Sequence, residues 1–360
     1  MIRLLVVDDS PLMRRLLTQI FMAEGDFAIS VARSGAEAIE MLTQVAPDVV
    51  TLDINMPGMD GLACLDRIMV TRPCPVVMLS SMTAAGADET LEAMALGAID
   101  FVAKPKGAVS LEIDALAPEL IEKVRAAAAA RIPQTLRLRD RVRARSASTI
   151  KKPKSTTSRP PTATPIKRAD TGIVVVGSST GGPPALDRLL GDLPGDFPWP
   201  IVVAQHMPAS FTGPLARRLD KLCALGVREV TRTTPLEPGH AYIGKGDADL
   251  ILSRRSDSLV VIPAPSSPAH FWHPSVDRLM ESAIRHVSAQ GLIGVLLTGM
   301  GSDGAAAMNQ LRGLGGYTIA EAAETAVVWG MPGSLVALDG ACAVHPLDQI
   351  AGALMALVGR

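Results

Sequence analysis

The stretch that organises the chain is Ile173–Leu186, which reads IVVVGSSTGGPPAL. Its four apolar residues predict a buried strand, the glycines a tight turn, and the two prolines the first turn of a helix. Within the turn, Ser179 is the central residue of a G-x-S-x-G pattern. This pattern is typical of a serine nucleophile on a sharp strand-to-helix turn. A phosphate cradle or an ordinary turn has the same glycines, so the remaining motifs decide between these readings.

Composition limits the classes of protein to which the chain can belong. The chain has 360 residues, of which 48% are hydrophobic and 3% aromatic, and its formal net charge is -1. The length predicts two or three domains, and the composition predicts a core of aliphatic residues and Met, as in α/β proteins. The near-zero charge argues against a nucleic-acid-binding or membrane-binding protein.

The termini and cysteines indicate a cytoplasmic protein. The apolar run after Met1 is ended by Asp8 and Asp9, too early for a signal peptide, and no apolar stretch reaches membrane-spanning length. We therefore expect no membrane insertion. The four cysteines are scattered without C-x-x-C spacing, which predicts neither a disulfide framework nor a zinc site.

Residues 1–125 alternate between predicted strands and helices. The helix that starts at Ser10-Pro11 has a capping serine and a proline in its first turn. Alternation of this kind predicts a parallel sheet with helices on both faces. The predicted strands are Leu4–Val7, Val49–Leu52, Val76–Leu79 and Ile99–Ala103.

Polar side chains follow these strands, where ligands bind in an open α/β sheet. They are Asp8, Asp9, Asp53, Ser80 and Lys104. Three carboxylates in one cleft repel each other unless a cation compensates, and oxygen ligands suit Mg²⁺. The metal and the lysine could then neutralise a phosphoryl group while a carboxylate attacks phosphorus. The alternative is that each aspartate is a helix cap or a surface charge.

The motifs of this region resemble those of a response-regulator receiver domain. The resemblance is carried by Asp8-Asp9, by Asp53–Gly61 (DINMPGMDG) and by Lys104-Pro105. It implies a flavodoxin-like strand order 2-1-3-4-5 and phosphorylation at Asp53. It also implies Mg²⁺ binding by Asp8, Asp9, Asp53 and the backbone carbonyl of Asn55, phosphoryl contact by Lys104, and a switch pair formed by Ser80 and Phe101.

Residues 126–170 have the composition of a basic Ser/Thr/Pro-rich linker. Residues 131–168 hold 12 Lys and Arg and one acid, Asp140, and Ala126–Ala130 could extend the preceding helix. Such a segment cannot bury a core. An acidic docking partner or nucleic acid is the alternative to a solvated tether, but no aromatic residue is present for base stacking. Leu136–Arg145 could form a basic helix.

In residues 171–360, polar residues again follow the predicted strands. His206 follows Ile201–Ala204, and Asp303 lies in a glycine-rich turn after Leu292–Leu297, before a helix near Ala305. Together with Ser179 they can form an activated serine, in which histidine takes the proton and the carboxylate orients the imidazole. The chain order Ser, His, Asp differs from that of α/β-hydrolases, which predicts a different fold.

Two alternatives remain at this point. Asp303 could cap the helix at Ala305 as well as orient a histidine. Only His206 combines a buried strand before it with a proline soon after it. The other histidines, for which structural roles are the alternative, are His240, His270, His273, His286 and His345.

The second region resembles the protein-glutamate methylesterases of bacterial chemotaxis. The matching motifs are Gly177–Gly182, Gln205–Pro208, Pro274–Asp277 and Thr298–Gly304, and His273 stands where relatives often have Arg. The resemblance implies hydrolysis of glutamyl methyl esters and deamidation of glutamines on methyl-accepting chemotaxis receptors. It implies Ser179 as nucleophile, His206 as base, Asp303 as its orienting group and the Met300 amide as oxyanion donor, with no cofactor in this domain and a histidine kinase as phosphodonor.

The predicted architecture is a flavodoxin-like receiver domain (1–125), a linker (126–170) and a second doubly wound, mostly parallel α/β methylesterase domain (171–360). A receiver in front of an enzyme suggests that it covers the Ser179 edge until Asp53 is phosphorylated. A non-catalytic binding module gated by the receiver is the runner-up. A transcription factor fits poorly, because the second region lacks a basic recognition-helix pattern.

Overall fold

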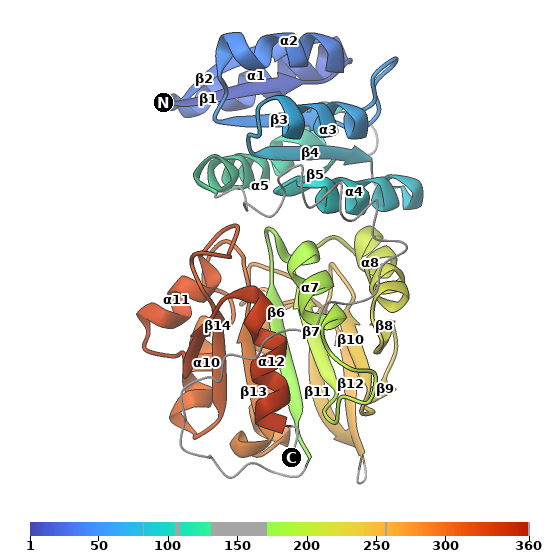
Figure 1. The fold of residues 1–360 in the computed structure, drawn as a ribbon, viewed down its shortest axis with the longest axis vertical. Helices are drawn as coiled ribbons and strands as arrows, with labels where there is room; N and C mark the ends of the chain where they lie inside the picture. The colour runs from blue at the N-terminus through green and yellow to red at the C-terminus, as the bar shows by residue number, and fades with distance from the viewer. Residues whose placement is uncertain (82, 105–108, 131–170, 256–257, 359–360) are drawn as a thin grey trace, which may run out of the picture.

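The computed structural model describes residues 1–360 except 82, 105–108, 131–170, 256–257 and 359–360. Its described part contains a five-stranded sheet, a seven-stranded sheet and a small three-stranded sheet. The first sheet and its helices lie above the other two along the long axis of the molecule (Figure 1).

The five-stranded sheet has the order β2-β1-β3-β4-β5, and every neighbouring pair is parallel. This confirms the flavodoxin-like order expected from the sequence. The strands are β1 (Ile2–Val7), β2 (Phe27–Ala32), β3 (Val49–Asp53), β4 (Val76–Ser81) and β5 (Asp100–Lys104).

Helices cover both faces of this sheet because its strands are apolar on both faces. Leu4 and Val6 pack in one cluster with residues of α1 and α5, whereas Leu5 and Val7 pack with residues of α2, α3 and α4. Ser10 caps α1 as predicted, its hydroxyl accepting from the Met13 amide. The helices are α1 (Pro11–Glu24), α2 (Gly35–Val45), α3 (Gly61–Thr71), α4 (Ala84–Leu96) and α5 (Val109–Ala129).

The seven-stranded sheet is also wholly parallel, with the order β15-β14-β13-β6-β7-β10-β8. The expected strands at Ile173, Ile201 and Leu292 occupy its centre. Its strands are β6 (Ile173–Ser178), β7 (Ile201–Gln205), β8 (Gly226–Val230), β10 (His240–Gly244), β13 (Leu292–Leu296), β14 (Tyr317–Glu321) and β15 (Ala343–His345).

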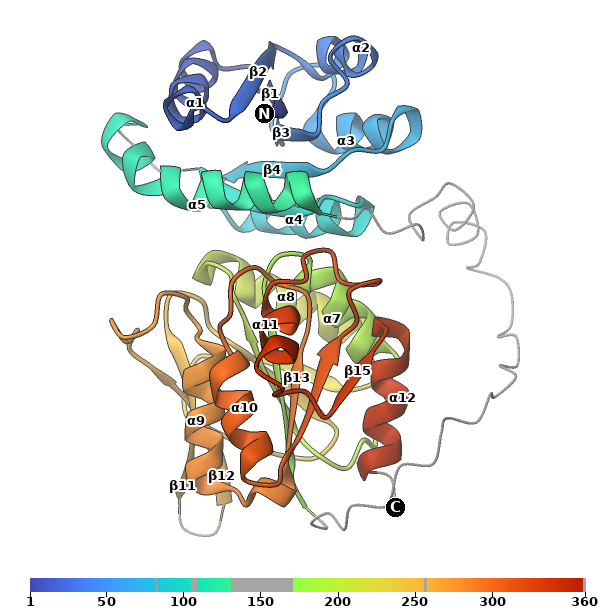
Figure 2. The same ribbon diagram turned by 90° about the vertical axis from the view of Figure 1, so that its left-hand side faces the viewer.

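Alternate residues of β6 face opposite layers of helices. Val174 and Val176 pack with α7, α8 and α12, whereas Ile173 and Val175 pack with α9, α10 and α11. This doubly wound arrangement agrees with the predicted fold class (Figure 2). The helices are α7 (Gly182–Gly191), α8 (Ala209–Leu222), α9 (Val276–His286), α10 (Ala305–Gly313), α11 (Met331–Ala337) and α12 (Leu347–Val358), with a short 3-10 turn η3 (Ala289–Gly291).

The small sheet is antiparallel and lies beside α9. Its order is β11-β12-β9, and β11 also contacts α9. The strands are β9 (Thr234–Pro235), β11 (Asp249–Arg255) and β12 (Ser258–Ala264).

The two halves of the molecule meet at the carboxyl edge of the seven-stranded sheet. In both views α4 and α5 face α7, α8 and the loops at the top of that sheet (Figures 1 and 2). The Phe101 ring lies 4.3 Å from the Phe211 ring, centroid to centroid. The hydroxyl of Thr180 donates to a carboxylate oxygen of Asp100, and Arg218 donates to the Leu91 carbonyl at 3.1 Å.

Several expectations concern the segment between the sheets. Helix α5 runs to Ala129, so the predicted division at 125/126 falls within a helix. The predicted tether from 131 onward and the basic helix over Leu136–Arg145 lie outside the described residues. Among the described helices, none has the length and apolarity that crossing a bilayer requires.

The strand-to-helix turn leaves no room for a side chain at Gly182. A Cβ there would lie 1.9 Å from Gln205 Oε1, whereas a Cβ at Gly191, in the same helix, would meet nothing within 4 Å. We predict that Gly182→Ala lowers the free energy of unfolding by about 1–3 kcal/mol, because Gln205 must move. We expect Gly191→Ala to be neutral or to stabilise by less than about 1 kcal/mol. Equal denaturation midpoints for the two variants would contradict this account.

Candidate active site

Ser179 lies directly beyond β6, at the centre of the carboxyl edge. Its amide donates to the Thr298 carbonyl at 3.0 Å, and Gln205 Nε2 donates to its carbonyl at 3.0 Å. Gly181 follows with φ of 76°, a left-handed conformation that favours glycine. Both neighbouring strand ends therefore hold the serine in place.

His206 reaches this edge because β7 pairs with β6 in register. Ser178 lies opposite Gln205, and the His206 amide donates to the Ser178 carbonyl at 3.0 Å. The imidazole Nε2 lies 2.8 Å from Asp303 Oδ2, whereas the buried Nδ1 has no hydrogen-bond partner within the described part of the chain. If Nε2 carries the proton that Asp303 accepts, Nδ1 keeps a free lone pair for a substrate-side proton.

The Asp303 carboxylate is surrounded by donors. Besides His206, the amide of Val276 donates to it at 2.7 Å, the amide of Asp277 at 3.0 Å and the hydroxyl of Ser275 at 3.0 Å. These groups form the N-terminus of α9, where amides and the helix dipole favour an anion. Burial raises the pKa of Asp303, but the hydrogen bonds outweigh it and leave the pKa below its ordinary value. The group is therefore ionised at neutral pH.

Asp303 does not itself cap α10, although the sequence left that role open. The N-cap of α10 is Gly304, which has no side chain with which to cap the helix. Asp277, on α9, accepts from the Ala307 amide at 2.9 Å instead. Asp303, which precedes α10, therefore accepts from amides at the N-terminus of α9, whereas Asp277 of α9 accepts from an amide at the N-terminus of α10.

The turn expected to supply the oxyanion donor lies against the serine. Gly299 packs so closely that an added Cβ would lie 2.8 Å from the Ser179 Cβ. Met300 follows it in this turn, and Met331 donates its amide to the Gly299 carbonyl at 2.8 Å. Met300 directly follows the glycine that packs on Ser179, so its amide as donor to a developing oxyanion stays a prediction.

Trp272 is a component of the site that the sequence did not reveal. Its ring stacks on the His206 imidazole with centroids 5.3 Å apart and planes 10° apart, and Phe271 packs edge-on against it. The stack limits rotation of the imidazole. An isolated Trp in a loop carries no pattern that predicts this contact.

His273 and the polar residues around it hold the loop that carries Trp272. His273 Nδ1 lies 2.9 Å from Asp249 Oδ1, which also accepts from the Ser275 amide at 2.9 Å. Arg278 bonds to the other oxygen of Asp249. His273, which stands where relatives often have Arg, thus forms a hydrogen bond with the buried Asp249.

The receiver-like cluster also converges. One carboxylate oxygen from each of Asp8, Asp9 and Asp53 lies within 4.8 Å of the others, and Lys104 Nζ lies 2.9 Å from Asp8 and 2.7 Å from Asp53. Burial raises the pKa of Asp53, and nearby Asp8 adds to the rise while Lys104 opposes it. Three oxygen donors with incomplete charge compensation fit Mg²⁺, which would balance the carboxylates and an incoming phosphoryl group.

The two residues expected to act as a switch have contacts outside this cluster. The Ser80 hydroxyl lies 3.1 Å from the Gly86 carbonyl and 2.6 Å from Thr90 Oγ1. Phe101 is 3% exposed and lies at the junction with Phe211. In the carboxylate cluster itself, the backbone amide of Asn55 donates to Asp53 Oδ1 at 3.2 Å.

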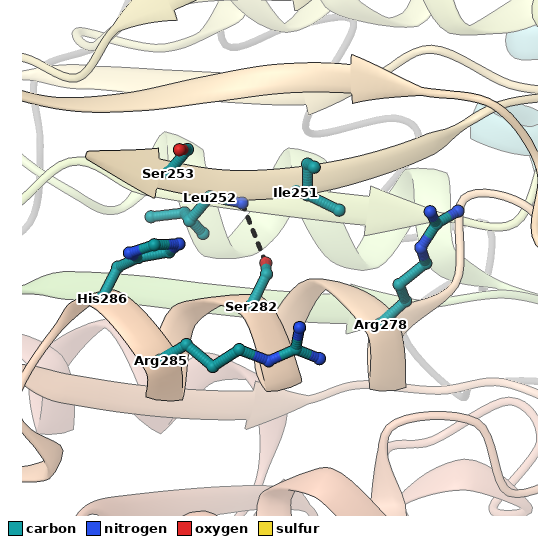
Figure 3. Close-up of a pocket in the computed structure, with 7 residues that line it drawn as sticks. All are labelled: Ile251, Leu252, Ser253, Arg278, Ser282, Arg285 and His286. Atoms are coloured by element: carbon teal, nitrogen blue, oxygen red, sulfur yellow. Dashed lines mark hydrogen bonds between the residues drawn. The ribbon is translucent and has the colours of Figure 1, made fainter. Parts of the chain in front are cut away.

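A separate pocket of about 190 Å³ lies between β11 and α9. Figure 3 shows its lining, in which Ser282 accepts from the Leu252 amide and α9 also contributes Arg278, Arg285 and His286. Of its lining residues, Arg278 also bonds to Asp249 in the network around His273, and none is Ser179, His206 or Asp303. The pocket therefore plays no part in the chemistry considered below.

Glu321 is a buried acid that the sequence analysis did not single out. It ends β14, is 0% exposed, and accepts from the Thr298 amide at 2.7 Å and the Thr325 hydroxyl at 3.0 Å. Burial raises the pKa of its carboxyl to about 7, against the lowering effect of these two hydrogen bonds.

We predict that Glu321→Gln removes a pH dependence of stability. Since the folded pKa exceeds the unfolded one, the acid's contribution is complete below about pH 4.5 and is lost as the pH rises to about 7. A shift from 4.5 to about 7 corresponds to about 3 kcal/mol. Relative to the variant, the wild type should lose stability between pH 5 and pH 8, measured by denaturant unfolding of both proteins. Parallel curves would show that Glu321 does not titrate in this range.

Comparison with known proteins identifies two families along the chain. Residues 174–354 match the family model for the CheB methylesterase, and residues 4–113 match the response regulator receiver domain. The crystal structure of the Thermotoga maritima CheB methylesterase catalytic domain is 41% identical, with a TM-score of 0.50, and covers 52% of this chain and 98% of that one.

Two full-length relatives match over nearly the whole chain. A protein-glutamate methylesterase/protein-glutamine glutaminase 2 of Rhodopseudomonas palustris (strain BisB18) is 53% identical, over 99% of this chain and 98% of the relative. A protein-glutamate methylesterase/protein-glutamine glutaminase 3 of Rhodospirillum rubrum is 51% identical, over 100% of this chain and 97% of the relative. The chain therefore belongs to the CheB methylesterase family and carries a response regulator receiver domain in front of the enzyme domain.

Proposed function

We propose that the chain hydrolyses glutamyl methyl esters, and deamidates selected glutamines, by a Ser179-His206-Asp303 mechanism. The observation that carries the proposal is the 2.8 Å contact between His206 Nε2 and Asp303 Oδ2 at the strand end next to Ser179. An ionised aspartate fixes the imidazole and stabilises its protonated form, which is the support that a serine nucleophile requires.

The reaction follows from these three groups. His206 Nδ1 takes the hydroxyl proton as Ser179 Oγ attacks the side-chain acyl carbon, and the electron pair of the C=O bond moves to oxygen. As the tetrahedral intermediate collapses, the C–O bond to the methoxy group breaks and His206 returns the proton, releasing methanol. Water then attacks the acyl-enzyme with His206 again as base, and Ser179 leaves. With a glutamine, the leaving group is ammonia.

Support for the substrate class comes from the relatives. Their names specify protein-bound glutamate esters and glutamines. We infer that the substrates here are methyl-accepting chemotaxis receptors, that a histidine kinase supplies the phosphoryl group at Asp53, and that the enzyme works in the cytoplasm, where its four free thiols would persist. No cofactor is required for the hydrolytic step itself, and Mg²⁺ would serve phosphorylation.

Regulation is part of the proposal. Ser179 is 8% exposed and His206 9% exposed, and Thr180, the residue after the proposed nucleophile, bonds to Asp100 on β5. Because β5 ends at Lys104, which contacts Asp53, a phosphoryl group there would displace the same strand that lies against Thr180. Phosphorylation would then separate the halves and admit a receptor helix.

We predict that Ser179→Ala abolishes methanol release from methylated receptor fragments while the protein stays folded. A fluorophosphonate probe should label the phosphorylated wild type but not this variant. The control is Ser178→Ala: Ser178 donates its hydroxyl to Gln205 at 2.6 Å, so its loss should weaken the turn yet leave labelling at Ser179. Methanol release at the wild-type rate without Ser179, or an unreactive wild type, would favour a non-catalytic binding module.

We predict further that deleting residues 1–130 raises basal methanol release by about 5- to 150-fold, the range given by a coupling free energy of 1–3 kcal/mol. Asp53→Asn is the companion variant: it should keep the low basal rate and fail to respond to a phosphodonor with Mg²⁺. An unchanged or lower rate after the deletion would argue against occlusion by the receiver.

A further inference from the structure

The buried carboxyl of Glu321 is connected to the turn that carries Ser179 through a single residue, Thr298. Glu321 Oε2 accepts from the Thr298 amide at 2.7 Å, and the carbonyl of the same Thr298 accepts from the Ser179 amide at 3.0 Å. The backbone of Thr298 is therefore held on one side by the acid and on the other by the proposed nucleophile.

The side chain of Thr298 strengthens this connection. Its hydroxyl donates to the Thr180 carbonyl at 2.9 Å and accepts from the Val328 amide at 3.0 Å. A displacement of Thr298 would thus move the backbone on both sides of Ser179. It would also move Gly299 and Met300, which follow it in the turn Thr298–Met300, called the oxyanion turn below.

The main chain of Glu321 holds the loop that supports the other side of this turn. Its carbonyl accepts from Trp329 Nε1 at 2.9 Å. Beside Trp329, the Val328 carbonyl accepts from the Gly299 amide at 3.0 Å. One residue at the end of β14 therefore contacts both the oxyanion turn and its supporting loop.

We propose that Glu321 is a positioning residue for catalysis, which holds the Thr298–Met300 turn at the distance from Ser179 that the transition state requires. The proposal rests on the hydrolytic function proposed above. Glu321 touches Thr298 rather than the site of reaction, so it acts through the turn. Its loss should lower kcat and leave KM almost unchanged, because transition-state stabilisation depends on donor placement more steeply than substrate binding does.

The test compares two substitutions of similar length in the full chain, activated with a phosphodonor and Mg²⁺. Glu321→Gln keeps an acceptor for the Thr298 amide and can donate to Thr325, so kcat should stay within about threefold of the wild type. Glu321→Met leaves the Thr298 amide unpaired, and kcat should fall about 10- to 100-fold, the effect of a misplacement of about 1 Å, with KM changed by less than about threefold.

A control separates positioning from loss of stability. Thr318 is a buried residue of the same strand, but its hydroxyl bonds to Gly340 and Cys342, at the end of the strand away from Ser179. Thr318→Val should lower the unfolding midpoint as Glu321→Met does while keeping kcat. If Glu321→Met does not fold, Glu321→Asp takes its place, since its shorter side chain withdraws the acceptor from Thr298.

The rate of fluorophosphonate labelling at Ser179 gives a readout independent of the receptor substrate. Labelling should slow in the Met or Asp variant and recover in the Gln variant. If the wild type is labelled but releases no methanol, the proposed substrate is wrong and the labelling rates still test Glu321. Wild-type kcat and labelling in the Met or Asp variant, or an equal loss in Thr318→Val, would overturn the positioning role. Absence of labelling in the wild type would overturn both proposals.

Discussion

The parallel register of β7, β6 and β13 is the constraint on which the site depends. Ser178 pairs with Gln205 and Gly177 with Leu296, so the three strands end at the same level. Beyond each strand the backbone turns away from the sheet, and the first polar residues after the three strands lie at the same edge. Parallel pairing makes this possible because all carboxyl ends face the same way, where backbone amides of the following helices also point. A register shift of one residue would turn the strand's side chains to the opposite face.

The strand ends were predictable because fully buried parallel strands consist of continuous apolar runs. Ser179, His206 and Asp303 each follow such a run, so their convergence required only the fold class. The order of the seven-stranded sheet was not predictable, because it depends on long crossovers rather than local pattern. Trp272 and Glu321 were missed for a similar reason: their contacts with His206 and Thr298 arise when segments far apart in the sequence pack together.

The junction between the halves joins two sites that the sequence analysis treated separately. Asp100 begins β5, and Lys104 ends it. The same short strand therefore contacts the carboxylate cluster at one end and the turn of the proposed nucleophile at the other. Asp100 also lies 3.3 Å from Lys123 Nζ, which pairs with Glu119 at 3.0 Å and donates to the Phe101 carbonyl at 2.8 Å. A strand held at both ends can transmit a small displacement, because packed elements move as units rather than deform.

Two buried acids at the catalytic edge have opposite environments, and this difference suits the chemistry. Asp303 receives four hydrogen bonds, including those from the N-terminus of α9, and its pKa lies below the ordinary value. Glu321 receives two, and burial raises its pKa to about 7. In the proposed mechanism, the ionised acid contacts the imidazole that becomes positive, whereas the acid that ionises less readily supports the turn where negative charge develops. Environment, rather than residue type, thus divides the roles of the two carboxyls.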